Sequence, residues 1–245
     1  MKLITRKLHT YFYMFSVLFL YLFFHPFFYY FSRKPERYLA LNKLRTKWAK
    51  WSSAMSGILY ELEFEVDFDR KKTCVICPNH TSNLDVSWAT LIPQGNFSFM
   101  GKEELLQNPT TKLFFKTIDI TVKRDSNISA FKAFKRASDY LKSGISMVIF
   151  PEGKIDEIYP PVLQDFKIGP FRLAIEQQVP VVPVSAANTW KILWDDGLKY
   201  GSRPGICKIY VHKPIETVGL SLADADALRD LVYVTISQKL KDYEN

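Results

Sequence analysis

The chain changes character at residues 78–85, which read Pro78-Asn79-His80-Thr81-Ser82-Asn83-Leu84-Asp85. The short apolar run Cys74-Val75-Ile76-Cys77 precedes this stretch and has the composition of a buried strand. We therefore expect a strand to end here and to turn directly into a helix, which leaves His80 at the carboxyl edge of a sheet. Asp85 would lie about one turn into the helix, close enough for its carboxylate to reach the His80 imidazole.

A histidine held by a carboxylate is suited to general base catalysis. A neutral imidazole accepts a proton near pH 7, and a carboxylate on its other nitrogen fixes the tautomer and stabilises the imidazolium that forms. His80 and Asp85 would be the base and its orienting group of a serine-protease triad that lacks a protein nucleophile, so the nucleophile would be a substrate hydroxyl. The spacing alone also fits a histidine at a strand end and an aspartate on a solvated helix turn.

The pattern of apolar residues predicts alternating strands and helices after residue 60. Strands are expected at residues 61–68, 73–77, 97–100, 118–122, 145–150, 181–184 and 206–211, and helices at 84–91, 102–107, 110–116, 128–141, 171–177 and 222–240. This alternation predicts an α/β fold with a mostly parallel sheet covered by helices. Ligands bind off the carboxyl ends of such strands. Three of these ends carry polar groups: Asn79-His80, Lys123-Arg124-Asp125 and Pro151-Glu152-Gly153.

The net charge of +8 is concentrated at the N-terminus. Residues 1–60 hold ten Lys/Arg and one acid, whereas the remainder holds 23 basic and 24 acidic residues. A nucleic-acid-binding surface on the later domain would need its own basic cluster, so we expect no nucleic acid partner.

Residues 1–60 have the composition of a membrane-binding helical motif. Residues 11–31 are apolar and aromatic over about 21 positions, enough to cross a ~30 Å hydrocarbon core, but His25-Pro26 interrupts them and predicts a kink or break. Basic residues flank both ends, which suits a segment that dips into one leaflet as well as one that spans. Residues 36–60 predict a basic amphipathic helix that lies at the interface or packs on the core. We expect two domains, 1–60 and 61–245.

The three cysteines predict no metal site. Cys74, Cys77 and His80 supply at most three zinc ligands, and the only other cysteine is Cys207. Buried, inert thiols are expected instead, and they fit a reducing compartment, which places the domain in the cytoplasm.

Four blocks of sequence resemble the glycerolipid acyltransferase family, the PlsC-like 1-acylglycerol-3-phosphate acyltransferases. They are Asn79–Asp85, Val122–Asp125, Phe150–Gly153 and Val179–Val184, with a similar linking segment at Phe166–Ala174. The resemblance covers roughly residues 60 to 215, and the family's N-terminal two-helix membrane motif fits residues 9–60.

The resemblance implies acyl transfer from an acyl thioester, acyl-CoA or acyl carrier protein, to the hydroxyl of a lysophospholipid. With 1-acylglycerol-3-phosphate as acceptor the product would be phosphatidic acid. His80 would take the hydroxyl proton and Asp85 would hold His80, while Arg124 with Lys123 would face the acceptor phosphate. Glu152 would bind the acceptor or shape the site, and Gly153 would permit close backbone approach. No cofactor is implied, and the location would be the cytoplasmic face of the bacterial inner membrane.

One departure from the family leaves the acceptor open. The family usually continues Pro-Glu-Gly with Thr-Arg, whose arginine contributes to phosphate binding, but residues 154–157 are Lys, Ile, Asp and Glu. Lys154 would substitute as a point charge, or Asp156 and Glu157 would face the amine of a lyso-aminolipid such as a lyso-ornithine lipid. Two rival activities remain: a non-catalytic membrane lipid-binding protein, and a thioesterase in which water replaces the hydroxyl.

Overall fold

The computed structural model describes residues 1–123 and 126–243. The strands are β1 (Ile58–Phe64), β2 (Val75–Pro78), β3 (Asn96–Lys102), β4 (Ile120–Val122), β5 (Ile145–Val148), β6 (Val181–Ala186) and β7 (Gly205–Val211). The α-helices are α1 (Lys2–Ser32), α2 (Tyr38–Met55), α3 (Leu84–Ala89), α4 (Lys112–Phe115), α5 (Asn127–Lys142), α6 (Gly169–Gln177), α7 (Thr189–Ile192) and α8 (Ala225–Asp242). Three 3₁₀ turns complete the described part: η1 (Pro35–Arg37), η2 (Glu103–Leu106) and η3 (Leu222–Asp224).

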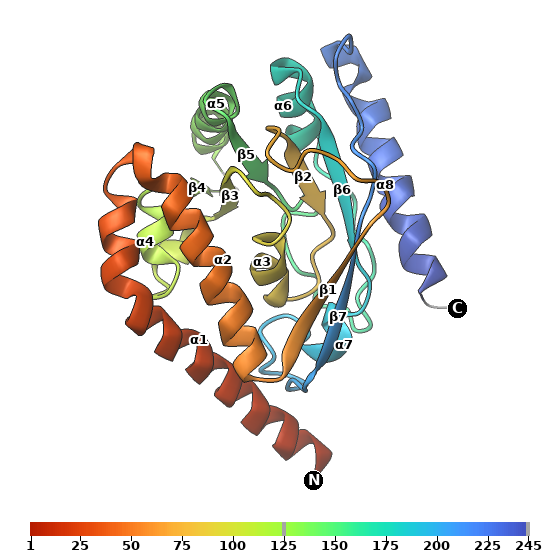
Figure 1. Ribbon diagram of the computed structural model, residues 1–245. Helices are drawn as coiled ribbons and strands as arrows, with labels where there is room; N and C mark the ends of the chain where they lie inside the picture. The colour runs from red at the N-terminus through yellow and green to blue at the C-terminus, as the bar shows by residue number, and fades with distance from the viewer. Residues whose placement is uncertain (124–125, 244–245) are drawn as a thin grey trace.

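The strands form one sheet in the order β1-β7-β6-β2-β5-β3-β4. β6, β2, β5, β3 and β4 are mutually parallel, β7 is antiparallel to β6, and β1 is parallel to β7. The predicted mostly parallel α/β fold is therefore confirmed, with one reversed pair at an edge. The carboxyl ends of the five parallel strands share the edge at the lower end of Figure 1, where the N-terminus of α1 and helix α7 also lie.

Successive side chains of each buried strand point to opposite faces of the sheet and join two apolar clusters. Helices cover both clusters, one on each face. Ile76 of β2 packs with α3, whereas Val75 and Cys77 pack with α5, α6 and α8. Cys74 and Cys77 thus point to opposite faces and are buried as free thiols. Burial raises the pKa of the Cys74 thiol to about 11 and raises that of Cys77 further, so both stay protonated and unreactive.

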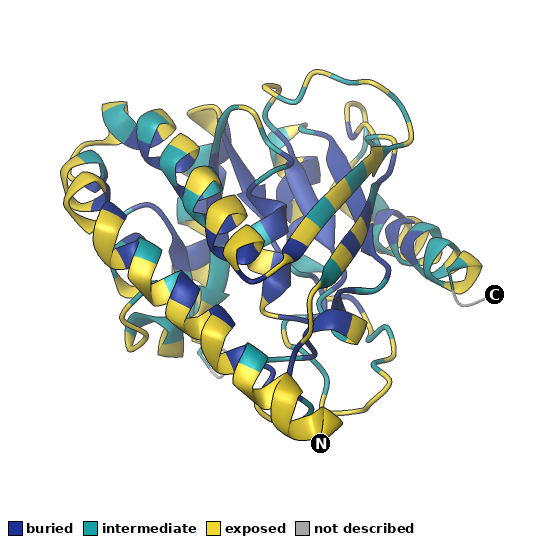
Figure 2. Cartoon of the chain, turned by 60° about the horizontal axis from the view of Figure 1, so that its bottom comes forward, coloured by how far each residue is buried: buried dark blue, intermediate teal, exposed yellow. Residues whose placement is uncertain are grey.

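The N-terminal segment forms a helical hairpin packed along one side of the domain (Figure 1). Of the kink or break expected at His25-Pro26, the break is absent, because α1 continues to Ser32 and the chain turns only at Arg33–Lys34. Phe24 and Phe28 pack on α2 and α4 on either side of Pro26, which holds the helix together across the lost hydrogen bond. The outward face of α1 is largely exposed and apolar (Figure 2), and by length and composition this helix could cross a membrane.

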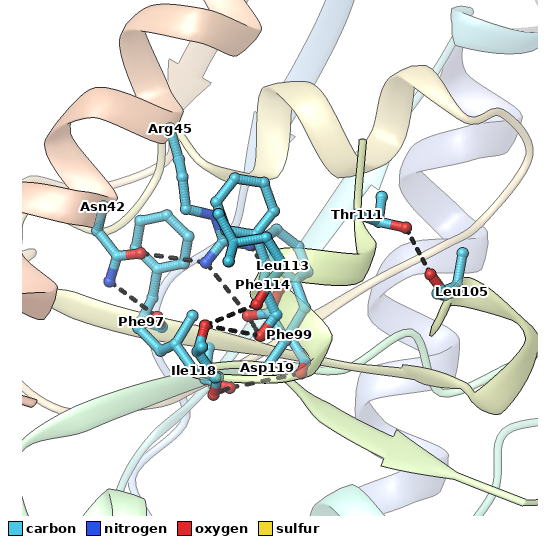
Figure 3. Close-up of polar contacts among 12 residues, drawn as sticks. Asn42, Arg45, Phe97, Phe99, Leu105, Thr111, Leu113, Phe114, Ile118 and Asp119 are labelled. Carbon is cyan, nitrogen blue, oxygen red and sulfur yellow. Dashed lines mark hydrogen bonds and ion pairs between the residues drawn. The ribbon is translucent and has the colours of Figure 1, made fainter. Parts of the chain in front are cut away.

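A buried ion pair fastens α2 to the sheet (Figure 3). The Arg45 guanidinium donates to both carboxylate oxygens of Asp119, at 3.1 and 2.7 Å. It lies 4.6 Å from the centre of the Phe114 ring, and the Phe99 N–H also donates to Asp119. Asn42, one turn before Arg45, donates to the Phe97 carbonyl at 2.8 Å. The basic character of α2 is therefore not wholly directed to the surface, since one of its cations closes the contact with β3 and β4.

This pair predicts a specific pattern of stability. Arg45→Met would leave the Asp119 carboxylate buried without a countercharge, which costs about 3–5 kcal/mol. Adding Asp119→Asn removes the stranded charge and keeps an acceptor for the Phe99 N–H, so the double variant should recover most of the loss. Thermal unfolding in detergent measures both, and a double variant less stable than Arg45→Met would contradict the buried-charge explanation.

Candidate active site

The site is built on the loop that leaves the carboxyl end of β2. Asn79 fixes this loop to the neighbouring strand, because its side-chain amide donates to the Ala186 carbonyl at 3.3 Å and its side-chain oxygen accepts the Ala186 N–H at 2.7 Å. The chain then turns within five residues into α3. The strand, turn and helix lie where the sequence places them, with His80 at the sheet edge.

Asp85 is fully buried and organises the loop around its carboxylate. It accepts four hydrogen bonds: from His80 Nδ1 at 3.1 Å, the Thr81 N–H at 2.7 Å, the Ser82 N–H at 2.8 Å and Trp88 Nε1 at 2.9 Å. Because the carboxylate only accepts, neutral His80 carries its proton on Nδ1 and keeps the Nε2 lone pair. The His80 side chain is 15% exposed, and its ring stacks on Phe150 with centres 4.0 Å apart.

Glu152 follows β5 and clamps two loops together. One carboxylate oxygen accepts the His80 N–H at 2.6 Å, and the other accepts the Gln164 N–H at 2.8 Å. Burial raises the pKa of Glu152 to about 7, against the lowering effect of these two N–H groups. Of the two roles expected for Glu152, the geometry favours shaping the site, because both oxygens hold backbone.

Gly153 brings the backbone close to Lys167, a residue to which the sequence motifs assign no role. Its φ of +75° favours glycine, and a Cβ built there would lie 3.1 Å from Cε and Nζ of Lys167. The ammonium of Lys167 therefore lies directly over the turn that carries Glu152. The sequence carried one signal for Lys167: this residue lies in the linking segment Phe166–Ala174, which resembles the family.

Two of the other predicted cations, Lys123 and Lys154, lie within the described residues. Lys123 follows β4, which two strands separate from β2, so the two strand axes lie roughly 14 Å apart at ~4.8 Å per step. Its backbone N–H donates to Ser129 Oγ. Lys154 is exposed directly after Gly153, and Arg124 lies outside the described residues. Lys102 is the last residue of β3 and so also lies at a strand end. It was not predicted as a strand-end cation, because the strand was expected to stop at residue 100.

A third carboxylate, Asp195, joins the site from a loop far along the chain. Its backbone N–H donates to the Thr81 carbonyl at 3.2 Å, and its carbonyl accepts the Asn83 N–H at 2.9 Å. Burial raises the pKa of Asp195, as does Asp196, while the charges of Lys102 and His80 act in the opposite direction. No sequence pattern marked this residue, because it follows no strand end. Within residues 1–123 and 126–243, no group of three or more metal-binding side chains is present.

The Glu152 clamp predicts how stability changes with pH. Between about pH 4.5 and pH 7 the folded protein holds a proton on Glu152 that the unfolded chain has released. Its stabilising contribution is therefore complete below about pH 4.5 and is lost as the pH rises through about 7. Glu152→Gln removes this titration, so the Tm of the wild type minus that of the variant should fall between about pH 5 and pH 8. Fluorimetric melting curves measure it, and a pH-independent difference would contradict the shifted pKa.

The part of the chain that contains the four sequence blocks also matches known proteins. A family model described as Acyltransferase matches residues 61–187, just over half of the chain. The 1-acyl-sn-glycerol-3-phosphate acyltransferase beta of Homo sapiens is 28% identical over 186 residues, which are 74% of this chain and 66% of that protein. The chloroplastic 1-acyl-sn-glycerol-3-phosphate acyltransferase BAT2 of Brassica napus is 31% identical over 144 residues, 58% of this chain and 40% of that protein.

The fold has a close counterpart among solved structures. The crystal structure of the 1-acyl-sn-glycerophosphate acyltransferase PlsC from Thermotoga maritima matches with a TM-score of 0.80 and 21% identity, over 100% of this chain and 98% of that one. The chain spans less than two thirds of several curated relatives that it matches, for example 63% and 40% of two of them. The family model, the ordered blocks and the site geometry agree: the chain belongs to the acyltransferase family.

Proposed function

We propose that the protein transfers a fatty acyl group from an acyl thioester, acyl-CoA or acyl carrier protein, to the hydroxyl of a lysophospholipid. The acceptor would be 1-acylglycerol-3-phosphate and the product phosphatidic acid. The observation that carries the proposal is the His80 ring, which is bound through Nδ1 to buried Asp85, keeps its Nε2 lone pair and belongs to a side chain that is 15% exposed.

The proposed step needs no protein nucleophile. Nε2 of His80 takes the proton of the acceptor hydroxyl while the oxygen forms its bond to the thioester carbonyl carbon. The carbon–sulfur bond then breaks, and the departing thiolate takes the proton back from the imidazolium. Asp85 stabilises the imidazolium between these events. Proton and acyl group are balanced, so no cofactor beyond the acyl donor enters the proposal.

A phosphate acceptor fits the loop chemistry better than an amine. Asp156, one of the two acids that would face an amine, already accepts the Gln164 side-chain amide at 2.7 Å and the Glu157 N–H at 2.7 Å. Lys167, by contrast, lies over Gly153 next to the Glu152 turn and supplies the positive charge of the missing family arginine. The names of the relatives, 1-acylglycerol-3-phosphate acyltransferases, support the same choice.

The proposal includes attachment to a membrane through residues 1–60, with residues 61–245 as the catalytic domain. The exposed apolar face of α1 supports attachment, and the free, buried cysteines support a reducing compartment. The proposed location is the cytoplasmic face of the bacterial inner membrane.

His80→Ala should abolish acyl transfer while the fold is kept, because loss of a general base costs ~10²–10⁴ in rate. Asp85→Asn should also be severe, since an amide in place of the carboxylate cannot accept from all four donors. Product formed from an acyl thioester, with and without lysophosphatidic acid, measures both variants. Near-normal transfer by His80→Ala would end this mechanism. Thioester cleavage at the same rate with and without the acceptor would indicate a thioesterase. Lipid binding without any turnover would indicate a non-catalytic protein.

Lys167→Met should raise the apparent KM for lysophosphatidic acid by ~10- to 100-fold, the value of one charge-assisted contact of about 1.5–3 kcal/mol. The KM for the acyl donor should change little. Lys142→Met, an exposed lysine in the last turn of α5, is the matched control. A wild-type preference for an amine-bearing lysolipid, together with an unchanged KM in Lys167→Met, would refute the phosphate acceptor.

A further inference from the structure

Two loops at the active-site edge expose apolar side chains. One follows the Glu152 turn and exposes Ile158 (57%), Tyr159 and Val162 (59%). The other follows α7 and exposes Leu198 (49%). Together with Trp190 and Tyr200, whose rings both contact Tyr159, these side chains are called the loop surface below. On soluble proteins, an exposed apolar patch marks a site of contact with another protein or a membrane when it is large enough.

Aromatic contacts join the two loops into one unit. Tyr159 packs on Tyr200 with ring centres 4.3 Å apart, and on Trp190 at 5.6 Å. Lysines cover the outer rings, with Lys191 5.2 Å from the Trp190 ring and Lys199 5.3 Å from the Tyr200 ring. Tyrosine and tryptophan next to lysine are the residues that favour the boundary between hydrocarbon and headgroups.

The loop that carries Leu198 and Tyr200 continues into Gly201 and Ser202, which contact the first turns of α1. The Ser202 N–H donates to the Arg6 carbonyl at 3.0 Å, and Ser202 Oγ lies 2.7 Å from His9 Nδ1. A Cβ built on Gly201 would lie 2.5 Å from Arg6 Cβ, so the loop and helix are in direct contact. The exposed apolar residues Ile4 and Leu8 lie on other faces of the same turns of α1.

The same unit adjoins the catalytic loop. Thr81 Oγ1 lies 3.1 Å from Thr189 Oγ1 at the start of α7, and Asp195 pairs through its backbone with Thr81 and Asn83.

We propose that the loop surface is a second lipid-contact surface, occupied by the phospholipid bilayer. Two observations favour lipid over a second copy of the chain: the loop contacts the first turns of α1, a helix with exposed apolar residues, and the loop surface contains tyrosine and tryptophan next to lysine. The entrance to His80 is then bordered by lipid contacts from two parts of the chain, which presents the hydroxyl edge of an amphiphilic acceptor to the base. Since Asp156, Glu157 and Asp196 lie in the same loops, binding here depends on apolar insertion and little on salt.

The proposal rests on the proposed function for the identity of the acceptor and for the attachment of α1 to a membrane, and its first test needs no catalysis. Single cysteines introduced as Ile158→Cys or Leu198→Cys are labelled with nitrobenzoxadiazole, which the buried native cysteines with raised thiol pKa values do not take up. The full chain is reconstituted into phosphatidylcholine/phosphatidylglycerol vesicles with brominated acyl chains. Leu8→Cys on α1 is the comparison, and Val218→Cys is the control, because nearby Ile215 pairs with Val181 at the opposite edge of the sheet.

We expect labels at residues 158 and 198 to shift to the blue and to be quenched by brominated lipid, and the label at residue 218 to stay water-exposed. If the label at residue 8 is quenched while those at 158 and 198 are not, the proposal is refuted. Self-quenching of the labels at 158 and 198 without lipid quenching would indicate a second copy instead, which also refutes it.

A kinetic comparison completes the test. The triple variant Ile158→Glu/Val162→Glu/Leu198→Glu should lower kcat/KM for a vesicle-bound lysolipid about tenfold or more, since it replaces the apolar side chains that would enter the bilayer with charged ones. With a short-chain, monomeric lysolipid the rate should change less than about twofold. The control triple Val218→Glu/Leu222→Glu/Leu231→Glu should affect neither. Equal losses with both acceptors would refute a lipid-contact role, whereas quenched labels on a protein without transferase activity would refute the proposed function alone.

Discussion

The carboxylate of Asp85 is the constraint on which the site depends. A fully buried charge is tolerated only when polar groups surround it, and here two backbone N–H groups, the His80 ring and the Trp88 indole all donate to it. The loop is consequently shaped by the carboxylate before any substrate arrives. The tautomer of His80 follows from the same requirement, so the base is oriented by the electrostatics of folding and pays no reorganisation cost during the reaction.

A second carboxylate acts on the same loop from the other side. Glu152 accepts a hydrogen bond from the His80 N–H. Asp85 accepts from the Thr81 and Ser82 N–H groups. The Asp195 carbonyl accepts from the Asn83 N–H. Four consecutive backbone donors of the catalytic loop are therefore engaged within the protein. The donors for the oxyanion of an acyl-transfer intermediate must therefore come from other groups at this edge, such as Lys102 at the end of β3.

How much of the site the sequence predicts depends on how far apart along the chain the interacting residues lie. His80 and Asp85 are five residues apart and are joined by one turn, so local rules were enough to pair them, and strand-end logic placed Glu152 beside them. Asp195 lies more than a hundred residues away and reaches the site only through the sheet topology. Lys102 was lost through an error of two residues in a strand boundary. The reversed direction of β1 and β7 depends on long connections that periodicity does not encode.

The N-terminal helix shows the same limit and permits one further step. Apolar composition alone left open whether α1 spans a bilayer or lies in it. The structure seats α1 on the protein along its whole length, since Thr10, Tyr13, Tyr21, Phe24, Phe28 and Ser32 recur on one buried stripe. At its first turns it is bonded to the loop that carries Ser202, and near its end Phe28 packs on Phe114 with ring centres 5.1 Å apart. A spanning orientation would carry these packed groups, and the domain attached to them, into the hydrocarbon. If the helix binds lipid as proposed, its exposed face alone can do so, with the helix lying along one leaflet.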